Sequence, residues 1–425
     1  MFWLYVLQGL NYLVPLAVLP YLVRTLGVGR YGLLAFAQAF AQYFVILTDY
    51  GFNLSATRRI ALVRENKEEV SLVYWSVLFI KLALMMLGAI VVAALVSFIP
   101  RFRADALLYA IAYVAVIGNV LFPIWLFQGM EKMQYISVVS GGAKLLAALL
   151  LFALVHQPSD YVIALAIQSG GFLVAGIAGF WIALARFGIS YRQPSRIELS
   201  AALQDGWHLF VSNAAGTLYA TTNVFLVGLV AGNVEAGYFS AAERITRSIQ
   251  GMMGPITQAI YPHVSGLAAR SREFALAFLR KSLAWIGVLS FVPSVVLLFF
   301  ARPIAVILFG SAADGSIVPL RWLAMLPFVI SVSAVLAIQT MIPFGMEKQL
   351  SRIYVVAGLG SLALSLPLIH RYGASGGAAA VLAVEIAIVL AMWNVLNHNG
   401  INLWPGSMKA DGKRVKAKVE DAFTF

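Results

Sequence analysis

The chain has 425 residues, of which 61% are hydrophobic and only 11% are charged. Soluble domains contain about 25% charged residues, so this composition excludes an ordinary water-soluble domain, a disordered chain and a fibrous protein. Because so much apolar surface needs lipid as its solvent, we expect an all-α integral membrane protein.

Several kinds of site are excluded by the residue types that are missing or scarce. The sequence has no cysteine, which excludes disulfides, thiolate metal sites and cysteine nucleophiles, and its five histidines are scattered. We therefore expect no enzyme, no catalytic residue, no metal and no cofactor. The net charge of +12 points first to cytoplasmic loops near anionic lipid and second to an anionic substrate.

Twelve apolar segments are long enough to cross a membrane, and they follow one another along almost the whole chain. The first, from Phe2 to Val23, has no basic leader and no cleavage site, so it is predicted to be a retained helix and not a signal peptide. The others are predicted at 33–52, 73–99, 105–127, 137–156, 161–186, 206–231, 237–263, 281–301, 320–344, 351–369 and 376–397.

Lysine and arginine residues in the connections predict the orientation. One set of loops, together with the tail at 401–425, carries most of the basic residues and is therefore predicted to be cytoplasmic. Both termini are then cytoplasmic and the number of spans is even. Two segments next to these loops, Ala56 to Val70 and Ser265 to Lys281, have amphipathic patterns and are expected to lie on the inner leaflet.

A weak internal repeat relates the two halves of the sequence. Gly27-x4-Gly32 links spans one and two, and Gly232-x4-Gly237 links spans seven and eight. The four letters GMEK follow span four and return after span ten.

The repeat predicts two parallel lobes of six helices each, around a central cavity. We assign residues 1–200 to the first lobe, 201–400 to the second and 401–425 to a basic cytoplasmic tail. Because each unit has an even number of spans, the lobes are related by an axis along the membrane normal, which favours a transporter over a channel.

Eight ionisable residues are predicted to lie within the spans, where each needs a partner, a water-filled cavity or a helix end. The basic ones outnumber the acidic ones by five to three. They are Asp49, Lys81, Lys144, Glu243, Arg244, Arg247, Arg321 and Glu385.

Span eight carries three of these charges. Glu243 and Arg247 are four residues apart and can pair on one helix face, while Arg244 lies three residues before Arg247. One interpretation is a salt bridge near the helix end. The other is that Glu243 orients Arg247 and that both arginines face an anionic ligand, because the guanidinium group binds phosphate through two hydrogen bonds.

The remaining internal charges leave alternatives open. Lys81 and Lys144 either extend to the interface or line a cavity, and Asp49 is expected to face Arg58 or Arg59. Glu385 lies near the middle of span twelve and is either a neutral buried acid or a proton-coupling group.

Several segments together resemble a known family. They are PYLVRTLGVGRYGLLAFAQAFAQYFVILTDYGFNLSATRRIA at 20–61, AGYFSAAERI at 236–245, the GMEK turn after span four, and ARPIAVILFG at 301–310 with Leu320 and Arg321 after it. This pattern is similar to the Wzx-type polysaccharide-unit flippases, which share a superfamily with lipid II flippases and with multidrug and toxin extruders. The family usually has a short cytoplasmic leader, whereas span one begins here at Phe2, so we expect a mis-assigned start or a truncation.

The resemblance implies a flippase that moves undecaprenyl-diphosphate-linked oligosaccharide repeat units across the bacterial cytoplasmic membrane by alternating access. It implies O-antigen, capsule or exopolysaccharide assembly as the process, and a polysaccharide polymerase and a chain-length regulator as partners, with no nucleic acid. It also implies a cationic cavity, and the cavity candidates are Arg24, Lys81, Lys144, Arg244, Arg247 and Arg321. Protonation of a buried carboxylate could couple transport to protons, and the coupling candidates are Glu385, Glu243 and Asp49.

Two rival functions remain. The same fold could export lipid II or a cationic drug, although the internal basic excess argues against a cation, and lipid II flippases commonly have two further helices. A membrane-bound glycosyltransferase or O-antigen ligase would need large exterior loops. The longest predicted exterior loop, from Arg302 to Pro319, is too short for a catalytic domain.

Overall fold

Helices account for every regular element in the part of the chain that the structure, a computed structural model, describes. The described residues are 2–251, 271–310 and 314–403 and, between the first two ranges, Met253, Ile260, Val264 and Leu267. Within them, eight helices are long and apolar enough to cross a membrane, and two shorter apolar segments lie at Leu13–Leu26 and Thr222–Ala231. The prediction of an all-α membrane protein is confirmed.

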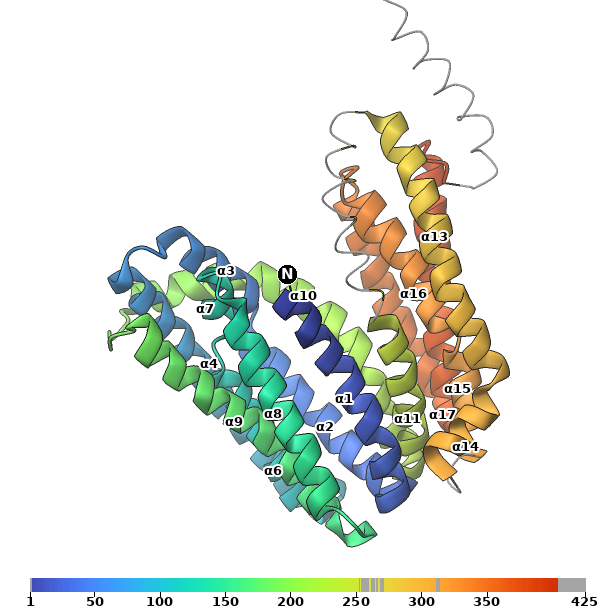
Figure 1. Cartoon of the computed structure of the whole chain (residues 1–425), viewed down its shortest axis with the longest axis horizontal. Helices are drawn as coiled ribbons and strands as arrows, with labels where there is room; N and C mark the ends of the chain where they lie inside the picture. Colours follow the sequence, from blue (N-terminus) through green and yellow to red (C-terminus); the bar gives the residue numbers. More distant parts are fainter. Residues whose placement is uncertain are drawn as a thin grey trace, which may run out of the picture. The chain divides into compact units, whose positions relative to one another are not determined.

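The described residues form two compact units, and the first comprises Met1–Ala241 with Leu308–Ala312. It holds the helices from blue to green in Figure 1. They are α1 (Phe2–Leu26), α2 (Val28–Asp49), α3 (Phe52–Val63), α4 (Lys67–Phe98), α5 (Pro100–Ala104), α6 (Ala106–Leu121), α7 (Ile124–Gly129), α8 (Met133–Leu154), the 3₁₀ turn η1 (Pro158–Asp160), α9 (Tyr161–Phe187), α10 (Arg196–Ala231) and the first turns of α11 (Asn233–Gly251).

The second unit comprises Ala242–Ile307 and Ala313–Phe425. Its helices are the rest of α11, α13 (Arg272–Phe299), most of α14 (Ala301–Phe309), α15 (Asp314–Leu323), α16 (Leu326–Ala334), the π-helix η3 (Val335–Met341) and α17 (Glu347–His398). Helix α17 contains predicted spans eleven and twelve, which are separated by a kink at Gly373, where φ is 57°. The tail from residue 404 onward lies outside the described residues.

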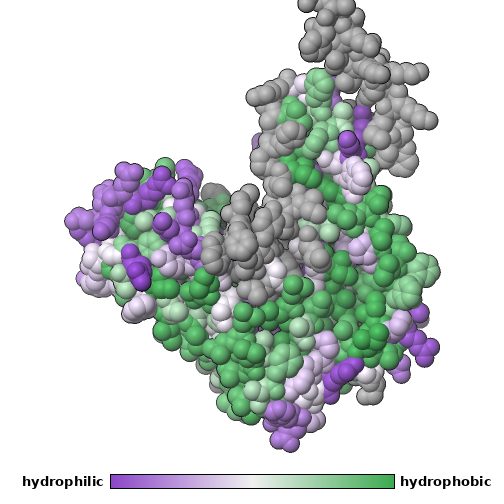
Figure 2. Space-filling view, in the orientation of Figure 1, coloured by the Kyte–Doolittle hydropathy of each residue, from purple (hydrophilic) through white to green (hydrophobic). Residues whose placement is uncertain are grey.

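The helices expose many apolar side chains, as expected for helices in contact with lipid. Ile90 of α4, Leu149 of α8 and Val356 of α17 are all exposed, although each is strongly apolar. Figure 2 shows hydrophobic residues along the visible faces of the helices and hydrophilic residues gathered near helix ends. This distribution fits helices that cross a bilayer, because only their ends meet water.

Aromatic side chains fill the centre of the first unit. Phe40 packs against Phe102 and Tyr109, with ring centroids 5.2 Å away in both cases. Phe36 stacks on Phe225 of α10 at 5.0 Å. These rings join α2, α5, α6 and α10, and they hold α2 in the middle of the unit.

The repeated glycines occupy equivalent positions in the structure. Gly27 and Gly232 precede α2 and α11 with φ values of 75° and 93°. A Cβ atom on Gly32 would lie 2.6 Å from the backbone nitrogen of Gly237, and one on Gly237 would lie 2.4 Å from the carbonyl oxygen of Val28. The first turns of α2 and α11 therefore cross in direct backbone contact, which only glycine permits. The lobe boundary at residue 200, the orientation and the cytoplasmic termini stay predictions.

Part of the first amphipathic segment, Ala56 to Val70, packs against other helices of the protein. The sequence predicts only a position on the inner leaflet for it. Phe52, Ala56 and Ile60 form the buried face of α3. A Cβ atom on Gly129, at the end of α7, would lie 2.6 Å from Ile60, so α3 and α7 are in close contact. The second segment, Ser265 to Lys281, lies partly outside the described residues, and its last part forms the beginning of α13.

Candidate functional site

The most deeply buried charge in the first unit is Lys81, in the middle of α4. Only 1% of its side chain is exposed, and the residues around it in the sequence are mostly apolar. Its Nζ donates to Asp49 Oδ1 and to the carbonyl oxygen of Asn119, at 3.2 Å in both cases. The amide of Asn119 also donates to Asp49 Oδ1, at 2.9 Å. Lys81, Asp49 and Asn119 thus join α4, α2 and α6, and we call them the Lys81 network.

The Lys81 network corrects two expectations. Lys81 does not extend to the interface, because its ammonium group is enclosed and bound by two oxygens. Asp49 pairs with Lys81 and not with Arg58 or Arg59, and Arg59 instead lies 3.8 Å from Asp205 of α10. Two charges removed from water are tolerable only when they are paired and hydrogen-bonded, which is the arrangement seen here.

A cavity of about 170 Å³ lies beside the Lys81 network. Asp49, whose side chain is 27% exposed, forms part of its wall. Asn53 also lines the cavity, and its side-chain oxygen is buried with no hydrogen-bond partner among the described residues. The described residues that line it are Gln42, Ile46, Asp49, Gly51, Asn53, Phe210 and Ala214.

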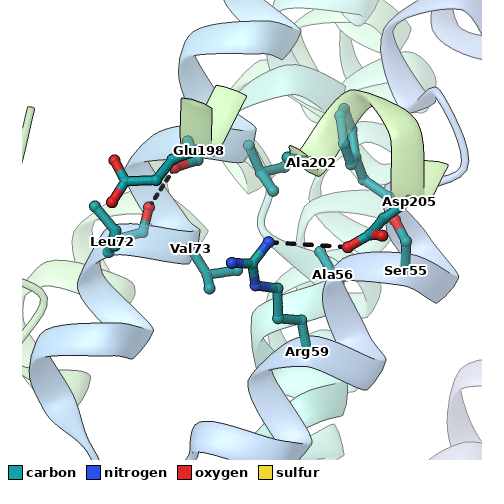
Figure 3. Close-up of a pocket in the computed structure, with 11 residues that line it drawn as sticks. Ser55, Ala56, Arg59, Leu72, Val73, Glu198, Ala202 and Asp205 are labelled. Atoms are coloured by element: carbon teal, nitrogen blue, oxygen red, sulfur yellow. Dashed lines mark hydrogen bonds and ion pairs between the residues drawn. The ribbon is translucent and has the colours of Figure 1, made fainter. Parts of the chain in front are cut away.

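A second pocket lies between α3, α4 and α10 (Figure 3). Arg59 points across it toward Asp205. Its volume of about 20 Å³ has room for about one water molecule, so it is too small for a substrate group. Glu198 at its edge accepts a hydrogen bond from the backbone nitrogen of Ser195 at 2.6 Å, and this bond lowers the pKa of the Glu198 carboxyl.

The other basic candidates of the first unit lie on different helices. Arg24 is exposed near the end of α1, and its Nε donates to the carbonyl oxygen of Leu308 at 3.1 Å. Lys144 is half-buried on α8. Neither residue belongs to the Lys81 network.

In the second unit, α11 carries the predicted pair. Arg247 donates to Glu243 Oε1 at 2.8 Å, so the i, i+4 pairing is confirmed. Arg244 is half-buried on the same helix, and Arg321 is exposed in the last turn of α15. This geometry agrees with the salt bridge expected near the helix end, and anion binding by Arg244 and Arg247 stays a prediction.

Glu385 is buried on α17, with 9% of the residue exposed. Tyr354, on the other side of the Gly373 kink, hydrogen-bonds with Ser333 of α16 and lies within electrostatic range of Glu385. Sequence reasoning missed Tyr354 and Ser333, because both are far from Glu385 along the chain. No periodicity relates them to it.

Comparison with known proteins identifies the family to which this chain belongs. A family model described as "Polysaccharide biosynthesis protein" matches residues 1–268. The "Putative O-antigen transporter" of Escherichia coli (strain K12) is 36% identical over 397 residues, which cover 93% of this chain and 96% of that protein. This chain belongs to the polysaccharide biosynthesis protein family. Another member, the "Putative O-antigen transporter" of Shigella dysenteriae, is 32% identical over 92% of this chain and 97% of its own length.

Solved structures show that this family shares its fold with two other kinds of transporter. The lipid II flippase MurJ in an inward closed conformation matches with a TM-score of 0.71 and 14% identity, over 93% of this chain and 87% of that one. An inward-facing multidrug resistance MATE family transporter of the MOP superfamily matches with a TM-score of 0.69 and 16% identity, over 91% and 95%. The family model and the relatives confirm the predicted polysaccharide exporter family, and the solved structures confirm the fold. These relatives and neighbours are transporters or flippases and not enzymes.

Proposed function

We propose that this protein moves undecaprenyl-diphosphate-linked oligosaccharide repeat units from the inner to the outer face of the bacterial cytoplasmic membrane. The observation that carries the proposal is the similarity, over more than nine tenths of both chains, to proteins named as O-antigen transporters. The family description, which concerns polysaccharide biosynthesis, points to the same process. A polysaccharide polymerase and a chain-length regulator would act next to it, and both termini would face the cytoplasm.

The charge inside the helices suits the diphosphate. Arg244 and Arg247 follow one another within a turn of α11, and Glu243 fixes the position of Arg247. A guanidinium group donates two parallel hydrogen bonds to phosphate oxygens, so two such groups can bind a diphosphate. Arg24, Lys144 and Arg321 would add positive charge along the path. Lys81 would act through Asp49, because its own ammonium group is enclosed.

Alternating access is supported by the fold. MATE family transporters with this fold have been solved in inward-facing and in outward-facing conformations, with TM-scores of 0.69 and 0.56 to this chain. A substrate with a large polar head cannot cross the hydrocarbon region unaided, so a site that opens to one side at a time is required. A different lipid-linked or amphipathic substrate on the same fold, such as lipid II or a drug, is the second candidate, because MurJ and MATE transporters share it.

Genetic complementation tests this function. The gene is expressed in a strain that lacks its own O-antigen flippase and that makes the matching lipid-linked repeat unit. We expect surface polysaccharide to reappear and the lipid-linked unit to stop accumulating. If the protein is present in the membrane and the unit still accumulates, the proposal is wrong, and growth rescue of a strain depleted of its lipid II flippase would favour the second candidate.

A further inference from the structure

The cavity beside the Lys81 network is large enough for a small ligand, and polar side chains line it. With about 170 Å³ it is much larger than the one-water pocket between α3, α4 and α10. It lies wholly within the first unit, because its walls come from α2, from the start of α3 with Gly51, and from α10. Asn53 is one of its lining residues, and its side-chain oxygen is a buried acceptor that no described residue satisfies. Buried acceptors without a donor are rare in native proteins, so a further donor, such as a ligand hydroxyl, is expected here.

The electrostatics of the cavity disfavour a strongly charged occupant. Asp49 is the one charged residue among the described residues of its wall, and Lys81 neutralises that carboxylate at 3.2 Å. An anion such as a diphosphate finds no positive group among those lining residues. A cation would have to compete with the ammonium group that already occupies Asp49 Oδ1. A neutral, polar occupant is therefore favoured.

The wall combines two chemistries that a sugar matches. Gln42, Asp49 and Asn53 present amide and carboxylate groups, which accept hydrogen bonds from hydroxyls, and the amides also donate. Phe210 provides an apolar wall, and it is held in place by stacking on Tyr50 at 4.9 Å with an interplanar angle of 14°. A sugar ring has hydroxyls around its edge and an apolar C–H face. Small-ligand sites commonly combine an apolar wall with a few polar groups in this way.

We propose that this cavity is a saccharide subsite, which binds one uncharged sugar ring of the substrate through Gln42, Asp49 and Asn53 against Phe210. The inference rests on the proposed function, since it assigns the sugar part of the lipid-linked substrate to the first unit. The substrate then has two recognition sites of different chemistry. The arginines of α11 bind the diphosphate, and the neutral cavity selects the sugar.

Binding of a free sugar tests the subsite apart from transport. The probe is the oligosaccharide released by mild acid from the lipid-linked repeat unit of the native host, so that it carries neither lipid nor diphosphate. Isothermal titration calorimetry measures its dissociation constant with the purified full chain in lipid nanodiscs. We expect Gln42→Leu and Asn53→Leu each to raise this constant about tenfold, which corresponds to the loss of one hydrogen bond to the ligand.

Gln38 offers a matched control one turn earlier on α2. Its amide already donates to Gln168 at 2.8 Å, and it does not line the cavity. Gln38→Leu should therefore leave the dissociation constant of the oligosaccharide unchanged. Equal weakening by Gln38→Leu and Gln42→Leu would show a general effect of helix packing and would contradict the subsite.

A single thiol locates the bound sugar. Since the chain has no cysteine, Ala214→Cys places one reporter in the cavity wall. We expect the oligosaccharide to slow the reaction of this thiol with a maleimide, and sodium chloride or a short isoprenyl diphosphate without sugar to have no such effect. Protection by sodium alone, protection by the isoprenyl diphosphate alone, or no protection at all would overturn the proposal. Sugar binding by a chain that fails in the complementation test would refute the proposed transport and leave the subsite in place.

Discussion

At the scale of residues, the Lys81 network shows how a lysine is tolerated in the middle of an apolar helix. Its ammonium group is bound by Asp49 and by the carbonyl oxygen of Asn119, so both charges are compensated inside the protein. The two partners are not equivalent. Lys81 is 1% exposed and Asp49 is 27% exposed, so the lysine depends more on its partner than the aspartate does.

This asymmetry gives a stability prediction. Asp49→Asn leaves a buried, unpaired ammonium group and should destabilise the protein by about 3–5 kcal/mol, whereas Lys81→Met should cost less. The double variant Asp49→Asn/Lys81→Met should recover most of the loss, because no charge stays buried. Thermal unfolding of the purified protein, followed by size-exclusion fluorescence, measures all three. Arg64→Ala is the control, because its exposed pair with Glu131 at 2.8 Å should contribute at most about 1 kcal/mol. Additive losses in the double variant would contradict the ion pair.

The arginines of α11 give a second prediction at this scale. Arg244→Ala and Arg247→Ala should each impair export of the lipid-linked sugar while the protein still inserts. Lysine at either position should rescue export in part, because the charge survives and the two-pronged hydrogen bonding does not. The readout is accumulation of the lipid-linked unit in a flippase-null strain. Full complementation by both alanine variants would leave these arginines with a structural role alone.

At the scale of elements, the crossing of α2 and α11 is the most demanding contact in the first unit. A methyl group on Gly32 would lie 1.7 Å from the carbonyl oxygen of Asn233, so one of the two helices must move. We expect Gly32→Ala to reduce the yield of folded protein sharply, since overpacking against backbone costs about 1–3 kcal/mol or more. Gly142→Ala, on the exposed side of α8 with no atom within 4 Å, should be neutral or stabilising. Equal folded yields for the two variants would contradict the crossing.

The positions of the helices along the chain were predictable, but the pairing of side chains between different helices was not. Each predicted span overlaps a helix, because a run of apolar residues long enough to cross a bilayer is a signal contained within one segment. The i, i+4 pairing of Glu243 with Arg247 is likewise local and was predictable. The pairing of Asp49 with Lys81 joins two helices, so it depends on their rotation and register. Nothing along the chain distinguishes it from a pairing with Arg59, which is closer in sequence.

At the scale of the whole molecule, the proposed alternating access requires an equilibrium between two states, and a buried acid can bias it. A protonated carboxyl group is much easier to enclose in a dry interface than an ionised one. Glu385 is the candidate, because it is buried and no basic residue lies within one helical turn of it along the chain. Tyr354 lies within electrostatic range of it.

Glu385→Gln should therefore abolish any dependence of transport on a pH gradient across proteoliposomes. The matched control is Glu131→Gln, which removes an exposed acid that pairs with Arg64 at 2.8 Å, and it should keep the dependence. Persistence of the dependence in Glu385→Gln would reduce this residue to a role in helix packing.

Reconstituted flipping tests the central claim most directly. The purified chain is placed in liposomes that contain the lipid-linked oligosaccharide, and a lectin that cannot cross the bilayer reports how much sugar reaches the opposite face with time. We predict that the chain speeds this movement well above protein-free liposomes and that the double variant Arg244→Ala/Arg247→Ala does not. A rate equal to that of protein-free liposomes, with the chain folded and inserted, would contradict the account.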